Sequence, residues 1–246
     1  IARMQDTELA VDATLRTESG RGQVRGTLDL ERPADPGFDL QLVAEQLDAS
    51  RRRDVVAVAD GRLFLRGRYS APVVSGSIRF TEGELDLGEI LRQYRIVQLE
   101  PWFYEVLDTT ALGFRPPQET PFLANLRVSG ATITVARDFW LRGPELNVEV
   151  AGELGVEYDR QAEDLRLSGS LQAVRGTYEL RVLEDVPGRR FDIRSGTIDF
   201  VGTPGIDPNL DIAARYRLRR AQGESIDVVA QVAGTLQNPR VSLTSE

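Results

Sequence analysis

Apolar and polar side chains alternate along most of the chain, and this alternation dominates the sequence. Leu146, Val148 and Val150, for example, are separated by single polar residues. The same alternation recurs in residues 24–30, 38–42, 63–69, 77–87, 126–135, 165–173, 210–218 and 226–232. Successive side chains of a strand point to opposite faces, so this period of two predicts strands with one apolar and one wet face. We therefore predict an all-β chain forming a long, curved, antiparallel sheet.

A glycine motif accompanies these strands and predicts where they bend. A small or polar residue, a glycine, a short side chain and an apolar run recur around Gly26, Gly76, Gly130, Gly152, Gly169 and Gly234. Glycine inside a strand marks a bend or bulge, and repeated bends curve a sheet. The alternation changes phase at Gly130, where we predict a bulge. Turns are predicted at 20–22, 60–61, 82–83, 187–188 and 195–196.

Residues 87–113 depart from the strand pattern, because their apolar positions follow helical spacing with an interruption at Pro101. We predict a short helical segment at 88–112 that plugs one end of the sheet. A membrane-surface helix is the alternative. It is disfavoured because the acidic residues Glu89, Glu100, Glu105 and Asp108 offset the arginines of the segment.

Composition excludes several classes of enzyme. The chain has 246 residues with 38 acidic and 30 basic side chains, a net charge of −8, and neither lysine, histidine nor cysteine. Imidazole bases, thiolate nucleophiles, lysine Schiff bases and His/Cys metal sites are thus excluded. The carboxylate pairs Glu163-Asp164 and Glu184-Asp185 are interpreted as solvated loop charges. We expect no catalytic residues, no metal and no cofactor, and the acidic balance speaks against nucleic acid as a partner.

The ends of the chain and its hydropathy bear on membrane association. No stretch approaches the roughly 18 apolar residues that a membrane-spanning helix needs. The chain begins at Ile1 without an initiator methionine or signal segment and stops at Glu246. We therefore expect it to be a fragment of a longer protein.

A one-sided apolar sheet must bury its apolar face, yet the sequence offers almost no helical partner layer. A sandwich, a closed barrel or a sheet folded over on itself to leave an apolar groove would each satisfy this need. An aromatic content of 7% argues against an outer-membrane barrel with its aromatic girdles. A groove lined by Leu, Ile and Val would suit acyl chains, at roughly 25 cal/mol per Å² of apolar surface sheltered from water.

The second half of the chain resembles the C-terminal domain family of TamB, the translocation and assembly module protein, within the AsmA-like group. The order and spacing of short strand-and-turn phrases carry this resemblance over residues 122–246. They lie at 126–130, 138–146, 167–171, 175–178, 191–193, 196–200, 207–214, 232–235 and 238–243. Residues 1–121 resemble the upstream β-rich part of the family in style, so two parts are predicted, 1–121 with the helical insertion and 122–246.

The resemblance implies a sheet curled into a U-shaped β-taco with an apolar interior. It implies the periplasmic part of a protein anchored in the inner membrane, with the anchor outside this chain. Family members are implicated in moving phospholipid between the two membranes and in outer-membrane protein assembly with TamA, a BamA-like partner. Contact with such a barrel is expected through a region beyond this chain.

Our hypothesis is a non-enzymatic lipid conduit whose partners are phospholipid acyl chains. The predicted groove lining comprises Leu146, Val148, Val150, Leu165, Leu167, Leu171, Ile198, Phe200, Leu210, Ile212, Ile226, Val228 and Val232. The stabilisation of a bound acyl chain would be spread over all of these side chains, because each one contributes only a small dispersion and transfer free energy. The alternative is a scaffold or chaperone for outer-membrane protein assembly that captures a client strand at an open sheet edge. A segment that only spaces its neighbours is a third possibility.

Overall fold

The computed structural model describes residues 2–5, 7–51, 55–86, 120–143, 146–180, 189–219 and 225–245. These form one sheet of thirteen strands and a single-turn helix, α3 (Pro121–Ala124). The strands are β1 (Ala2–Gln5), β2 (Glu8–Arg16), β3 (Arg21–Asp29), β4 (Gly37–Arg51), β5 (Val55–Arg68), β6 (Ala71–Asp86), β7 (Arg127–Arg142), β8 (Leu146–Asp159), β9 (Asp164–Leu180), β10 (Arg189–Pro204), β11 (Asn209–Arg219), β12 (Ser225–Thr235) and β13 (Pro239–Ser245).

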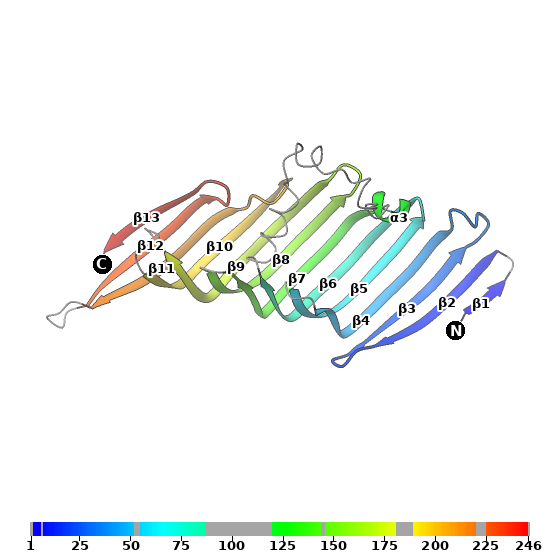
Figure 1. Cartoon of the computed structure of the whole chain (residues 1–246), viewed down its shortest axis with the longest axis horizontal. Coiled ribbons are helices and arrows are strands. Elements are labelled where there is room, and N and C mark those ends of the chain that lie inside the picture. Colours follow the sequence, from blue (N-terminus) through cyan, green and yellow to red (C-terminus); the bar gives the residue numbers. More distant parts are fainter. Residues whose placement is uncertain are drawn as a thin grey trace, which may run out of the picture.

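The strands lie side by side in chain order, so β1 and β13 form opposite ends of an open sheet (Figure 1). This confirms the predicted all-β, curved-sheet fold. Three architectures could bury the apolar face: a sandwich, a closed barrel or a single folded sheet. The order in which the described strands pair is that of a single curved sheet and not of a sandwich or closed barrel. The helical segment predicted at 88–112 lies outside the described residues.

One pairing differs from the predicted antiparallel sheet, because β6 and β7 are parallel. Residues 87–126 connect them, which is long enough for the crossover that parallel neighbours require. Alternation along a single strand carries no information about the direction of its neighbour, so the sequence pattern could not reveal this pair.

Register shifts mark a line across the middle of the sheet, which we call the crease. They occur in the pairs β4–β5, β5–β6, β6–β7, β7–β8, β8–β9 and β10–β11, near residues 45–50, 58–59, 80–83, 135–139, 149–150 and 193–195. A bulge bends its strand, so a row of bulges in neighbouring strands folds the sheet along that row. The result is a trough whose long axis crosses the strands, and the strands curve accordingly in Figure 1.

Polar side chains satisfy the backbone groups that the crease releases from strand pairing. The carboxylate Oδ1 of Asp60 accepts the amide of Gln46 at 2.7 Å. The carboxylate Oε1 of Glu149 accepts the amide of Asp138 at 3.0 Å. Both amide donors belong to residues with positive φ, 51° and 72°. These contacts remove the cost of unpaired backbone amides at the bends.

The repeated glycines occupy backbone conformations that other residues rarely adopt. All six motif glycines have positive φ, between 63° at Gly130 and 155° at Gly152. A Cβ on Gly152 would lie 2.2 Å from the carbonyl oxygen of Ser170 on the neighbouring strand. The bulge predicted at Gly130 is confirmed, since the β7–β8 register shifts between Val128 and Ala131.

Three predicted turns are wrong. Residues 60–61, 82–83 and 195–196 lie inside β5, β6 and β10. Each lies beside the crease, where glycine serves a bulge or a close approach instead of a chain reversal. At Gly83, for instance, an added Cβ would lie 2.7 Å from the ring of Phe139. The turn predicted at 187–188 lies outside the described residues.

The helix α3 packs against the edge of the sheet where β4 begins and β5 ends (Figure 1). Thr120 caps it through its hydroxyl, which accepts the amide of Leu123 at 3.4 Å, and Pro121 occupies the first turn. The ring of Phe122 packs between Phe38 and Tyr69, with centroids 5.9 Å from each. This contact covers apolar surface at the start of β4.

Candidate functional site

The apolar face of the sheet is the candidate site, and strand register defines it. Residues directly opposite each other in neighbouring strands share a face. In β8–β9 the pairs Val150 with Ala173 and Leu146 with Tyr178 lie on one face, and in β10–β11 Ile198 with Leu210 continues it. We call this the inner face. The other is the outer face.

Eight of the thirteen predicted lining residues belong to one continuous hydrophobic cluster on the inner face. They are Leu146, Val148, Val150, Leu171, Ile198, Phe200, Ile212 and Val228. Leu165, Leu167, Leu210 and Val232 share the inner face by register but lie outside the cluster. The side chain of Ile226 lies outside the described residues, although its backbone pairs with Leu218. Whether these side chains contact lipid stays a prediction.

The prediction missed nine further buried residues of the cluster, which lie along or beside the crease. The missed residues are Ala57, Val135, Phe139, Leu154, Ala173, Phe191, Ile193, Ala214 and Ala230, each less than 10% exposed. Several are alanines, which give little hydrophobic signal in a sequence. These residues continue the period-two alternation of the predicted lining residues, as Ala214 follows Ile212 on β11. That alternation is the sequence signal that could have identified them.

Exposure rises from the crease toward the C-terminal end of the trough. Val150 is 1% exposed and Ala230 is 6% exposed. On β13, Val241 and Leu243 lie on the inner face opposite Val232 and Ala230, and they are 50% and 55% exposed. Among the described residues, the inner face is therefore most sheltered along the crease and most exposed on β13.

The outer face has the opposite character, because arginine–carboxylate pairs bridge neighbouring strands across it. Such pairs include Arg21–Glu45 at 2.7 Å, Arg66–Asp39 at 3.2 Å, Arg127–Asp159 at 2.9 Å and Arg142–Glu84 at 2.9 Å. Exposed pairs of this kind stabilise a fold little. They do make the outer face hydrophilic, so the two faces of the same sheet differ sharply in polarity.

Glu149 is the one buried carboxylate of the outer face among the described residues, with 2% of its surface exposed. It accepts the amide of Asp138 and a hydrogen bond from the guanidinium of Arg175. The guanidinium of Arg175 lies over the ring of Trp140, 5.5 Å from its centroid. The amide of Asp138 and then Arg175 hold the pKa of Glu149 below its ordinary value, against the effect of burial. The carboxylate therefore stays ionised and fixes the crease between β7 and β8.

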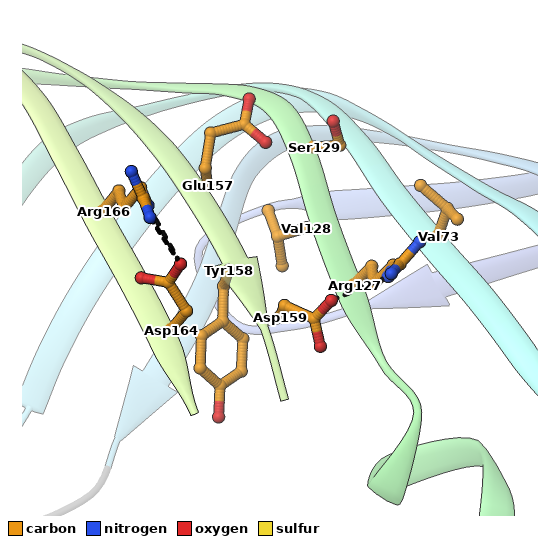
Figure 2. A pocket seen from close by; sticks show the side chains of 9 residues that line it. All are labelled: Val73, Arg127, Val128, Ser129, Glu157, Tyr158, Asp159, Asp164 and Arg166. Carbon is orange, nitrogen blue, oxygen red and sulfur yellow. Dashed lines mark hydrogen bonds and ion pairs between the residues drawn. The ribbon is translucent and has the colours of Figure 1, made fainter. Parts of the chain in front are cut away.

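A shallow hollow of about 380 Å³ lies at the edge of the sheet where β8 turns into β9 (Figure 2). Two ion pairs line it, Arg127–Asp159 and Arg166–Asp164. The amide of Ala162 and the guanidinium of Arg127 lower the pKa of Asp159. Since Arg166 neutralises Asp164, this half of the predicted Glu163-Asp164 pair is a paired surface charge. Glu184-Asp185 lies outside the described residues.

The inner face therefore presents apolar side chains along its length, and the outer face presents paired arginine and carboxylate side chains. The described part of the chain contains no helix with the length and hydropathy needed to cross a bilayer. The arrangement is suited to holding an extended apolar ligand against one side of a hydrated sheet.

Comparison with protein families matches residues 12–246 to the TamB C-terminal domain. The match begins well upstream of residue 122, so it includes the part that resembled the family only in style. The division into 1–121 and 122–246 stays a prediction. Comparison with curated proteins gives no match. The TamB domain connects the chain to the translocation and assembly module, within a membrane-associated protein of the cell envelope. With the family match covering nearly its whole length, this chain belongs to the TamB C-terminal domain family.

Proposed function

We propose that the chain is a non-enzymatic conduit in which the inner face shelters the acyl chains of phospholipids moving between the inner and outer membranes. It would act in the periplasm as part of the translocation and assembly module. A barrel partner of the TamA type would be reached through a region beyond this chain.

The observation that carries this proposal is the difference between the two faces of one sheet. The cluster extends from Ala57 on β5 to Ala230 on β12 without interruption by a charged side chain. A lipid methylene transferred from water to such a surface gains about 0.8 kcal/mol. Because this gain is distributed over many equivalent side chains, a lipid can move along the trough without leaving one deep binding pocket.

Photo-crosslinking with paired positions tests the proposal. A photoreactive residue would replace Ile212 or Val228 on the inner face, or the neighbours Ala213 and Val229, which alternate to the outer face. The protein would be expressed in cells whose phospholipids carry radioactive phosphate. The proposal predicts labelled lipid on the inner-face variants at several times the level of the outer-face controls. Equal labelling of both faces would refute it.

Strand capture by the edge of the sheet is the second candidate. It is favoured by β13, a terminal strand with two half-exposed hydrophobic side chains, Val241 and Leu243. Exposed edge strands can pair with another chain. The same crosslinking experiment separates the two candidates, because strand capture predicts protein adducts from positions on β13 and no lipid on the inner face.

A further inference from the structure

Arg189 is an exception to the pattern of the two faces. Strand register places it on the inner face, since it opposes Leu180 and precedes the inner-face residues Phe191 and Ile193 in phase. In the described strands, apart from bulge positions, no other arginine, aspartate or glutamate occupies an inner-face register position. The one charge on the apolar face is therefore a cation, at the first residue of β10.

The contacts of Arg189 are aromatic and neutral. Its Nη1 donates to the hydroxyl of Tyr216 at 3.1 Å, and its guanidinium lies 5.7 Å from the centroid of that ring. Tyr216 in turn packs against Phe191, with centroids 5.6 Å apart. No carboxylate among the described residues forms an ion pair with Arg189. Stacking leaves the remaining N–H donors of a guanidinium open to a planar or tetrahedral anion.

Arg189 lies at a rim of the trough and not in its depth. It lies four residue steps before Ile193 at the crease, or about 13 Å along an extended strand. Two aromatic side chains fill that distance. Phe191 is a member of the hydrophobic cluster and Tyr216 packs against it. A continuous apolar path therefore ends at an exposed positive charge that no carboxylate of the described residues pairs.

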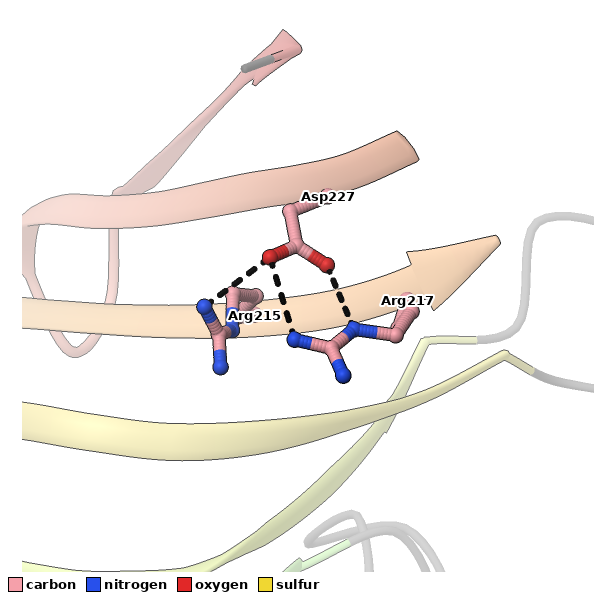
Figure 3. A network of polar contacts seen from close by, with 3 residues as sticks. All are labelled: Arg215, Arg217 and Asp227. Atoms are coloured by element: carbon pink, nitrogen blue, oxygen red, sulfur yellow. Dashed lines mark hydrogen bonds and ion pairs between the residues drawn. The ribbon is translucent and has the colours of Figure 1, made fainter. Parts of the chain in front are cut away.

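The outer face beneath this rim differs from it, because arginines and carboxylates pair there across neighbouring strands. Asp227 is bonded by Arg217 at 3.0 Å and Arg215 at 2.9 Å (Figure 3). Arg217 first, then Arg215 and Arg194, hold the pKa of Asp227 below its ordinary value. Two further carboxylates lie on this part of the outer face, Asp192 opposite Arg215 and Glu179 opposite Arg190. The charges beneath the rim are therefore mixed in sign, in contrast to the lone cation on the inner face above them.

We propose that Arg189 binds the phosphate of a phospholipid headgroup at the rim while the acyl chains lie on the inner face below it. This inference rests on the proposed function and adds the headgroup chemistry to it. The ligand is an amphiphile in which an anionic phosphate is joined to two acyl chains. A neutral diacylglycerol would occupy the trough without gaining from Arg189.

Calorimetric titration of the chain with three probes tests the inference. The probes are dihexanoyl phosphatidylglycerol, dihexanoylglycerol and inorganic phosphate. Arg189→Gln is expected to weaken binding of the phospholipid about tenfold, as expected for one lost charge-assisted contact, and to leave binding of dihexanoylglycerol within twofold. Arg190→Gln is the matched control, because it removes the same charge from the adjacent outer-face position and should change neither affinity. Arg189→Lys keeps the charge and should recover most of the loss.

The outcomes separate this inference from the proposed function. If the unaltered chain binds neither amphiphile, the conduit itself is refuted. If it binds both and Arg189→Gln matches the unaltered chain for phosphatidylglycerol, only the role of Arg189 is overturned. Inorganic phosphate bound as tightly as the phospholipid would also overturn it, by making the site one for free phosphate. A loss for both amphiphiles in Arg189→Gln with an unchanged circular-dichroism spectrum would contradict headgroup recognition as well.

Discussion

Removing the carboxylate of Glu149 should loosen the crease and lower the free energy of unfolding of the chain. The substitution Glu149→Gln keeps the volume and an acceptor oxygen for the amide of Asp138 but removes the charge that binds Arg175. Glu149→Ala removes both contacts. Because only 2% of Glu149 is exposed, water cannot replace either of them freely.

The magnitude follows from those two contacts. A hydrogen bond to a charged group contributes about 1.5–3 kcal/mol, and a buried donor left unsatisfied costs about 1–3 kcal/mol. We discount the Arg175 contact because that side chain is 64% exposed. The expected loss in free energy of unfolding is about 1 kcal/mol for Glu149→Gln and about 3 kcal/mol for Glu149→Ala.

The loss should also depend on pH in a defined direction. The pKa of Glu149 is lowered in the folded chain from its ordinary value of 4.5. Its ionised form therefore stabilises the fold fully above that ordinary value, and the contribution disappears as the pH falls through the lowered folded-state pKa. The difference between the unaltered chain and Glu149→Gln should accordingly be constant near neutral pH and shrink below about pH 4.

Urea unfolding followed by circular dichroism, at pH 7 and at several acidic values, measures both effects. Glu153→Gln is the control, since Glu153 lies on the same strand and face but is exposed. It should change the free energy by no more than about 0.5 kcal/mol. A Glu149→Ala variant as stable as the Glu153→Gln control would refute the idea that this carboxylate fixes the crease.

The remaining predictions concern the glycines of β8. Gly152→Ala should destabilise the chain by about 2–4 kcal/mol, because it combines strain at a φ of 155° with a Cβ 2.2 Å from the carbonyl oxygen of Ser170. Gly155→Ala should cost less than half as much, because its new Cβ meets the Ser168 hydroxyl, which can rotate away. Equal melting temperatures for the two variants would contradict the assignment of Gly152 to a required bend.

Much of the fold could be predicted because period-two alternation reports directly which side of a strand is apolar. Leu146, Val148 and Val150 illustrate this, since they alternate in sequence and share one cluster in the structure. Gly130 illustrates the glycine signal, because a phase change at a glycine has few structural causes other than a bulge.

The crease could not be predicted, since it arises from matching bulges in several strands and no single strand specifies it. Glycines next to it, such as Gly61 and Gly196, look like turn glycines in the sequence, but they serve close approach between strands: an added Cβ would lie 2.8 Å from the carbonyl oxygen of Ser77 and 2.9 Å from the side chain of Ile212. Arg189 could have been identified from phase alone, as it alternates with Phe191 and Ile193. A lone arginine at the end of an apolar row is easily interpreted as the start of a loop.

Lipid analysis of the purified chain tests the central claim most directly. Native mass spectrometry and organic extraction would be applied to the unaltered chain, to Val228→Asp and to Val229→Asp. Val228 is packed against the inner cluster, whereas Val229 alternates to the outer face opposite Arg215, so we expect a new carboxylate there to be tolerated. The account predicts co-purifying phospholipid with the unaltered chain and Val229→Asp, and its loss from Val228→Asp with the sheet still folded. Phospholipid retained by Val228→Asp at the level of the unaltered chain would contradict the account.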